Sequence, residues 1–221
     1  KDNFKKAEAI VFDFDNTLID EDYSIKLRWQ AVLGKYESEL KIDNFYNYFE
    51  EIFDSKGTSY KFHLDDTMKK VGLPMQFKNE IVKAFLRKKS LGEKVFSRVI
   101  ETLILIKSKG YKLAIFTNGL KDHQSVRLHK SGIEDYFDHI QYGDCSEKKP
   151  SRVGYEHLTK SLKLKNKNNF IMIGDNFDED YTGAVSYGGS CILINKHNFN
   201  NIKSPVYKSI EDFYFELNTL I

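Results

Sequence analysis

The sequence predicts an α/β fold in which a doubly wound parallel sheet carries an inserted, all-helical domain. Three observations predict this architecture. Short apolar runs of strand length alternate with helix-length amphipathic runs over residues 93–221. Several of these apolar runs end in small polar or acidic residues, as buried strands do where a loop begins. Residues from about 23 to 90 instead show apolar patches at helical spacing and no strand-like alternation. The predicted domains are therefore a core of residues 1–18 and 93–221 and a helical insertion of residues 19–92.

The composition is typical of a soluble globular protein and argues against several functional classes. The chain has 221 residues, of which 41% are hydrophobic and 30% are charged, enough to bury a real core. Its 34 basic and 32 acidic residues leave a net charge of +2, which gives no case for a nucleic-acid partner. The apolar runs are too short to span a membrane. Two cysteines form no disulfide framework, so we expect a cytoplasmic protein.

The first predicted strand ends at two carboxylates. An apolar run over residues 9–12 leads into Asp13 and Asp15, followed by Asn16-Thr17. Because an unpaired charge inside a buried strand is very costly, we expect both Asp residues at the carboxyl end of the strand, where open α/β sheets bind ligands. A Mg²⁺ ion, which prefers hard oxygen ligands, would relieve their mutual repulsion. The alternative is an ordinary turn rich in Asp, Asn and Thr.

The inserted domain is expected to contain about four helices. Apolar residues recur at helical spacing, and the breaks are predicted at Gly57-Thr58-Ser59 and Gly72-Leu73-Pro74. The domain is rich in aromatic residues, and their helical spacing indicates packing in the core of a small bundle more than a ligand-binding site. These aromatic residues are Trp29, Tyr36, Phe45, Tyr46, Tyr48, Phe49 and Phe53.

Strands and helices alternate in the remainder of the core. Helices are predicted at residues 95–109, 124–130, 153–162 and 210–220, and strands at residues 112–116, 138–142, 169–173 and 190–194. Right-handed crossovers between parallel strands place the carboxyl ends of the strands at one edge of the sheet. The polar residues expected at that edge are Asp13, Asp15, Thr117, Asn118, Lys149 and Asp175.

The residues expected at this edge have the chemistry of a phosphoryl-transfer site. Asp13, Asp15 and Asp175 offer oxygen ligands for one Mg²⁺ ion. Thr117, the backbone N–H groups after it, and Lys149 offer hydrogen-bond donors for a phosphate. A carboxylate can attack a polarised phosphate, and a second carboxylate can protonate the leaving alkoxide and then activate water.

Four motifs, in this order along the chain, resemble those of the haloacid dehalogenase superfamily. They are Asp13-Phe14-Asp15-Asn16-Thr17, Thr117-Asn118-Gly119, Lys149-Pro150, and Gly174-Asp175 with Asp180 five residues later. The resemblance covers nearly the whole chain and implies a Rossmann-like core with a C1-type helical cap. The dehalogenase branch of the family lacks an acidic residue at the position of Asp15, so the resemblance implies a phosphatase or a phosphotransferase.

The resemblance also implies roles for the two residues of the first motif and the two of the last. Asp13 would be the nucleophile and a Mg²⁺ ligand. Asp15 would be the general acid and base and would bind Mg²⁺ through its backbone carbonyl. Asp175 would bind the metal directly, and Asp180 would lie behind the metal ligands. Asp178 competes with Asp180 for the last role, and the Tyr181-Thr182-Gly183-Ala184 sequence favours Asp180.

The remaining implied roles concern the phosphoryl group. Thr117, Asn118 and Lys149 would bind it, and Thr17 would support the loop after the first strand. Lys148 is adjacent to Lys149, but Pro150 favours Lys149 because the family motif is Lys-Pro.

We expect a Mg²⁺-dependent phosphatase that hydrolyses the phosphomonoester of a small soluble metabolite through an aspartyl-phosphate. The sequence around Phe116-Thr117-Asn118-Gly119 and Ile194-Asn195-Lys196 resembles the group of N-acylneuraminate phosphatases, pyrimidine nucleotidases and phosphoglycolate phosphatases. This favours a sugar phosphate or a nucleoside monophosphate. The first alternative is a phosphomutase of the β-phosphoglucomutase kind. Further alternatives are a receiver-like phospho-accepting module and a non-catalytic binding module.

Overall fold

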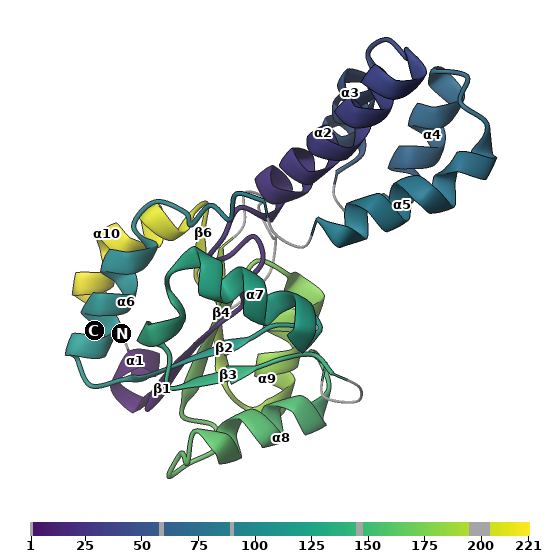
Figure 1. Ribbon diagram of the computed structural model, residues 1–221. Coiled ribbons are helices and arrows are strands. Elements are labelled where there is room, and N and C mark those ends of the chain that lie inside the picture. Colours follow the sequence, from purple (N-terminus) through teal and green to yellow (C-terminus); the bar gives the residue numbers. More distant parts are fainter. Residues whose placement is uncertain (1, 58–59, 89–90, 145–147, 195–203) are drawn as a thin grey trace. The chain divides into compact units, whose positions relative to one another are not determined.

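The computed structural model describes residues 2–57, 60–88, 91–144, 148–194 and 204–221 (Figure 1). The chain divides into two compact units, which we treat separately. The α/β unit comprises Lys1–Asp20 and Lys94–Ile221, and the helical unit comprises Glu21–Glu93.

A parallel sheet forms the centre of the α/β unit. In the described residues its strands are β1 (Ala9–Phe12), β2 (Lys112–Phe116), β3 (His139–Gln141), β4 (Phe170–Gly174), β5 (Ser190–Ile194) and β6 (Val206–Tyr207). The strand order is β3-β2-β1-β4-β5-β6, and every neighbouring pair is parallel. The order reverses between β1 and β4, and doubly wound sheets bind ligands outside the carboxyl ends of the strands at such a point. The predicted fold class is confirmed.

Both faces of this sheet are covered by helices. On β1, Ile10 and Phe12 point into one apolar core, while Ala9 and Val11 point into the other. The first core is closed by α1 (Asp2–Lys6), α6 (Val99–Ser108), α7 (Lys121–Ser131) and α10 (Ile210–Leu220) (Figure 1). The second core is closed by α8 (Arg152–Ser161) and α9 (Gly183–Tyr187). Burial on both sides explains why the strands appear in the sequence as continuous apolar runs.

Two predicted helices have different starts in the structure. The helix predicted at residues 95–109 begins only at Val99, because Arg98 has a left-handed backbone (φ 65°) and Val95 forms an antiparallel bridge with Ile19. The helix predicted at 124–130 is longer and begins at Lys121, where a polar first turn gave no apolar signal. Short elements were not predicted, since they are too brief to show periodicity: α1, α9, β6, the 3₁₀ turn η2 (Glu134–Tyr136) and the π-helical turn η4 (Phe177–Thr182).

The helical unit consists, in its described part, of α2 (Glu21–Leu40), α3 (Phe45–Lys56), α4 (His63–Lys70), the 3₁₀ turn η1 (Met75–Phe77) and α5 (Lys78–Arg87). Tyr36, Phe45, Phe49 and Phe53 are buried in its own apolar core, which confirms that these aromatic residues pack the bundle. The predicted break at Gly72 has a left-handed backbone (φ 70°), whereas Thr58-Ser59 lie outside the described residues. None of the described helices is both long and apolar enough to cross a bilayer.

Candidate active site

Asp13 and Asp175 follow two adjacent central strands. The backbone N–H of Asp13 donates to the carbonyl of Ile173 at 2.8 Å, which continues the pairing of β1 with β4 one residue past the end of β1. β4 ends at Gly174, so Asp175 begins the next loop at the same edge of the sheet. The two carboxylates therefore meet at the point where the strand order reverses.

The segment after Asp13 folds into a tight turn. Asn16 has a left-handed backbone (φ 56°), a conformation that Asn tolerates better than most residues, and its N–H donates to the carbonyl of Ile19 at 2.8 Å. The N–H of Leu18 donates back to the carbonyl of Phe14 at 3.0 Å. Thr17 is fully buried in this turn, and its hydroxyl has no hydrogen-bond partner within the described part of the chain.

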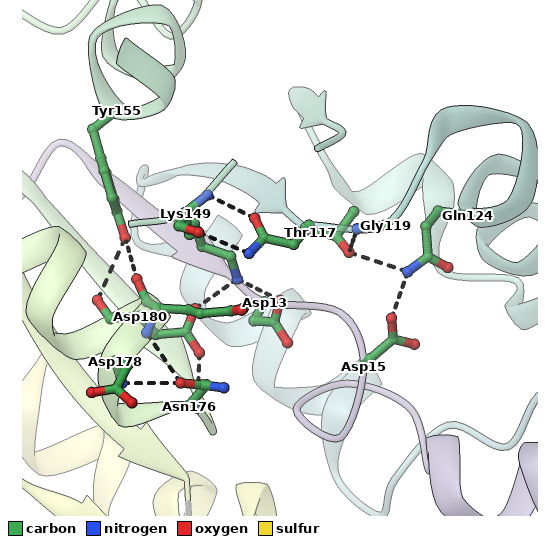
Figure 2. Close-up of polar contacts among 12 residues, drawn as sticks. Asp13, Asp15, Thr117, Gly119, Gln124, Lys149, Tyr155, Asn176, Asp178 and Asp180 are labelled. Carbon is green, nitrogen blue, oxygen red and sulfur yellow. Dashed lines mark hydrogen bonds and ion pairs between the residues drawn. The ribbon is translucent and has the colours of Figure 1, made fainter. Parts of the chain in front are cut away.

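Lys149 brings a buried positive charge to this edge. Its side chain is 1% exposed, and its ammonium donates at 2.6 Å both to Oδ1 of Asp13 and to Oδ1 of Asp180 (Figure 2). Burial lowers the pKa of Lys149, but the two carboxylates outweigh burial and hold that pKa above its ordinary value. Lys149, and not the exposed Lys148, therefore occupies the site.

Asn118 fixes the backbone of Lys149. The Asn118 side-chain amide donates to the Lys149 carbonyl at 2.9 Å, and its oxygen accepts from the Lys149 N–H at 2.7 Å. These paired hydrogen bonds tie the Lys149 segment to the end of β2. Much of the adjoining loop lies outside the described residues, including Cys145 and Ser146-Glu147.

Asp180 is completely buried on the turn η4. Its Oδ2 accepts from the N–H of Asn176 at 3.0 Å, and the carboxylate packs so closely on Gly174 that a Cβ there would lie 2.1 Å from Oδ2. Position 174 must therefore be glycine for the Asp180 carboxylate to occupy this place. Asp178, the competing position, is exposed, and its N–H is capped by the Asn176 side chain at 3.0 Å.

Asp13, Asp175 and Asp180 form one carboxylate cluster, in which an oxygen from each lies within 4.8 Å of the others. Burial raises the pKa of Asp13 well above its usual range even though Lys149 opposes the shift. Burial, and then the charge of Asp180, raises the pKa of Asp175 to about 7. The Lys149 ammonium contacts two of these three carboxylates, those of Asp13 and Asp180. The three carboxylates together offer hard oxygen ligands, so the cluster fits a divalent cation such as Mg²⁺.

Thr117 presents a hydroxyl at the end of β2. Its N–H donates to the carbonyl of Gln141 at 3.0 Å, which extends the pairing of β2 with β3. Its Oγ1 accepts from the N–H of Gly119 and from Nε2 of Gln124, both at 3.2 Å. Because a hydroxyl has two acceptor sites and one proton, these bonds leave the proton of Thr117 for a further acceptor.

Two residues that sequence reasoning missed hold the carboxylate of Asp15. Gln124 donates to its Oδ2 (Figure 2). Arg127 donates to its Oδ1 at 2.6 Å. The available signal was the i, i+3 spacing of two polar residues on the helix after Thr117, but spacing alone does not reveal which way that helix faces.

The structure brings the predicted site residues together at one edge of the sheet, with one difference in grouping. Asp180 lies within the carboxylate cluster, while the carboxylate of Asp15 turns away towards α7. The predicted role of Asp180 behind the metal ligands stays a prediction. The predicted contact of Asp15 with a metal was through its backbone carbonyl and stays a prediction. Asn195-Lys196, part of the sequence resemblance, lie outside the described residues.

Comparisons with known proteins agree with this geometry. A glyceraldehyde 3-phosphate phosphatase of Methanothermobacter thermautotrophicus is 30% identical over 85% of this chain and 85% of its own length. A human N-acylneuraminate-9-phosphatase is 22% identical over 98% of this chain and 94% of its own. The crystal structure of a HAD phosphatase from Thermococcus onnurineus has a TM-score of 0.63 and 26% identity, covering 96% of this chain and 97% of that one. The family model for haloacid dehalogenase-like hydrolases matches residues 10–194, and the chain belongs to this family.

Proposed function

We propose that this chain is a Mg²⁺-dependent phosphatase that hydrolyses the phosphomonoester of a small soluble metabolite through an aspartyl-phosphate on Asp13. The observation that carries the proposal is the buried contact of Asp13 with Lys149 inside the carboxylate cluster. A carboxylate beside an anion-binding ammonium is the arrangement that phosphoryl transfer to a carboxylate requires. Asp15, two residues further on, supplies a separate carboxylate for moving protons.

The proposed Mg²⁺ would be held by the carboxylates of Asp13 and Asp175 and the backbone carbonyl of Asp15, with Asp180 adding negative charge to the same cluster. When bound, Mg²⁺ neutralises charge on the phosphoryl oxygens and makes the phosphorus more susceptible to attack.

In the first step, a carboxylate oxygen of Asp13 attacks phosphorus, and the bond from phosphorus to the ester oxygen of the substrate breaks. Asp15 donates its proton to the departing alkoxide. Lys149 uses two of its three N–H donors on Asp13 and Asp180, which leaves one for a phosphoryl oxygen. The free proton of the Thr117 hydroxyl, and the backbone N–H of Asn118, serve the other phosphoryl oxygens.

In the second step, Asp15 is a carboxylate and acts as a base. It accepts a proton from a water molecule whose oxygen attacks phosphorus. The bond between phosphorus and the Asp13 oxygen then breaks, which releases inorganic phosphate. Asp13 is again a carboxylate and Asp15 again carries a proton, so the enzyme returns to its starting state.

The proposed substrate is a phosphorylated sugar, with nucleoside monophosphates as the second group. Relatives named for glyceraldehyde 3-phosphate and for N-acylneuraminate 9-phosphate support a small phosphorylated compound of the sugar kind.

We assign residues 1–18 and 93–221 as the catalytic core and residues 19–92 as a cap. A cap over such a site excludes bulky substrates, such as phosphoproteins, and alternates between open and closed states. A cytoplasmic location, with neither nucleic acid nor membrane as a partner, completes the proposal.

Phosphate release from a panel of phosphoesters tests this proposal. The panel holds glyceraldehyde 3-phosphate, other sugar phosphates, nucleoside monophosphates and an aryl phosphate, each with Mg²⁺ and with EDTA. We expect metal-dependent release that is highest on one chemical group and is lost in Asp13→Asn, which keeps the shape of the side chain. No release from any substrate would refute the phosphatase function. Conversion of one sugar phosphate isomer to another with a bisphosphate activator would support the phosphomutase instead.

A further inference from the structure

We propose that Gln124 and Arg127 of α7 are positioning residues, which fix the carboxylate of Asp15 for proton transfer to the leaving group. This inference rests on the proposed phosphatase function, in which Asp15 carries that proton. It adds two residues of the α/β unit that lie outside the four sequence motifs.

The two residues hold different oxygens of the same carboxylate. Nε2 of Gln124 donates to Oδ2 of Asp15 (Figure 2). Nη1 of Arg127 lies 2.6 Å from Oδ1 of the same carboxylate. Nη1 of Arg127 also donates to Oε1 of Gln124 at 2.9 Å, and this hydrogen bond fixes the two side chains relative to each other. Rotation of the carboxylate about its Cβ–Cγ bond would break both contacts with Asp15, which fixes its plane.

Burial shows from which side Asp15 is held. The side chain of Arg127 is 1% exposed and Gln124 is buried, whereas the side chain of Asp15 is 23% exposed. A buried guanidinium is costly unless its N–H groups find acceptors, and Oδ1 of Asp15 supplies one. Each oxygen of Asp15 accepts one of these two bonds and keeps a further acceptor site. Because Arg127 and Gln124 contact Asp15 from the buried side, its solvent-exposed side stays accessible to a leaving group or to water.

Gln124 also joins Asp15 to the proposed phosphate-binding hydroxyl. Its side-chain NH₂ group has two protons; it donates to Asp15 and, at 3.2 Å, to Oγ1 of Thr117. A Cβ on Gly119 would lie 2.3 Å from the same nitrogen, so the glycine leaves the space that this amide fills. One amide therefore sets the position of the proton carrier relative to the group that binds the phosphoryl oxygens.

Leaving-group dependence distinguishes positioning from a purely structural role. An alkoxide leaves only with a proton, whereas nitrophenolate leaves as a stable anion and needs little help from Asp15. The value of kcat/KM reports the first step, in which the leaving group departs. A residue that positions Asp15 therefore affects kcat/KM for an alkyl phosphate far more than for p-nitrophenyl phosphate.

The test variant is Gln124→Met, which keeps the length of the side chain and removes its hydrogen bonds. We expect kcat/KM to fall about 10- to 100-fold on the best alkyl phosphate of the panel, as misplacement of a catalytic group predicts. On p-nitrophenyl phosphate kcat/KM should change by less than about threefold, because that step bypasses the acid. A nitrophenol burst followed by slower turnover should also appear, since Asp15 must still activate water in the second step.

The matched control is Gln141→Met, which makes the same substitution at another buried glutamine. The Gln141 side chain donates to the carbonyl of Gly154 at 2.8 Å, and its contact with Thr117 is through the backbone, which the substitution keeps. We expect its alkyl-to-aryl ratio of kcat/KM to equal that of the wild type. If Gln124→Met does not fold, Arg127→Lys, which keeps the charge but loses the guanidinium, is subjected to the same comparison.

Equal losses on both substrates, or no loss on either, would refute the positioning role while leaving the phosphatase function intact. A wild-type enzyme that releases phosphate from neither substrate would refute the phosphatase function and this inference with it. A selective loss on the alkyl phosphate in Gln124→Met, absent in the Gln141→Met control, would support the positioning role of Gln124, and the same selective loss in Arg127→Lys would support that of Arg127.

Discussion

Replacing Lys149 by methionine should destabilise the protein by about 3–5 kcal/mol in the absence of divalent metal. Lys149 is 1% exposed and its ammonium lies 2.6 Å from carboxylates of Asp13 and Asp180, both nearly or fully buried. The substitution retains most of the apolar stem and removes only the charge. It leaves a cluster of three carboxylates without its buried cation, and breaking a buried ion pair by removing one partner is costly for this reason.

For a chain of this size, each kcal/mol corresponds to about 2–4 °C in Tm. The expected fall in Tm for Lys149→Met is therefore about 6–20 °C. Mg²⁺ should restore more stability to the variant than to the wild type, because the ion then supplies the only positive charge beside the described carboxylates. Adding Asp180→Asn to Lys149→Met should recover part of the loss, since it removes one of the charges left unpaired.

Urea unfolding followed by circular dichroism, with EDTA and with Mg²⁺, measures these changes. The matched control is Lys107→Met, which removes a surface ammonium 3.9 Å from Asp138 with both side chains over two-fifths exposed. Such a pair contributes at most about 1 kcal/mol. If Lys149→Met were no less stable than Lys107→Met, the result would contradict a stabilising buried ion pair between Lys149 and the carboxylates of Asp13 and Asp180.

Three further predictions concern other parts of the site. Asp15→Asn should lower kcat/KM on an alkyl phosphate by about 10²- to 10⁴-fold, the usual contribution of general acid–base catalysis, and steady-state phosphate release measures it. Burial and then Asp180 raise the pKa of Asp175 to about 7, so Mg²⁺ must displace a proton from Asp175 below that pH. The Kd for Mg²⁺, measured by calorimetry, should therefore rise as the pH falls below 7, by up to about tenfold per pH unit for this proton. Asp175→Ala should weaken binding and make the dependence shallower, and what remains comes from Asp13, whose pKa burial also raises. Gly174→Ala should destabilise the fold by about 1–3 kcal/mol in urea unfolding, because its Cβ would lie 2.1 Å from the carboxylate of Asp180; an unchanged midpoint would contradict that packing.

The sequence was most informative where chemistry and burial coincide. β1 and β4 are buried on both faces, so each appears in the sequence as a continuous apolar run. The first run ends at Asp13 and the second at Gly174-Asp175. Because parallel strands end at a common edge, the sequence alone predicts that these positions lie close together.

Other parts depend on contacts that are distant along the chain. The true start of α6 depends on the backbone of Arg98 and on pairing of Val95 with Ile19, neither of which alters the apolar periodicity. Gln124 and Arg127 follow the motif by several residues, and their role appears only when α7 packs over Asp15, more than a hundred residues earlier in the chain.

The entry of Asp180 into the carboxylate cluster has a similar origin. It depends on the π-helical turn η4, whose six residues carry no periodic signal, and on the absence of a Cβ at Gly174. The family motif therefore indicated the residue, while its burial against Lys149 required the three-dimensional packing.

The central claim is that Asp13 is the nucleophile, and trapping the phosphoryl group on it tests that claim most directly. Asp15→Asn, incubated with Mg²⁺ and p-nitrophenyl phosphate, should accumulate the intermediate, because the activated leaving group departs unaided and the second step lacks its base. After acid quenching and digestion with pepsin, mass spectrometry should find one hydroxylamine-labile phosphoryl group on the peptide that contains Asp13, and none when Asp13→Asn is added. A phosphoryl group on another residue, or phosphate release that persists in Asp13→Asn, would contradict the account.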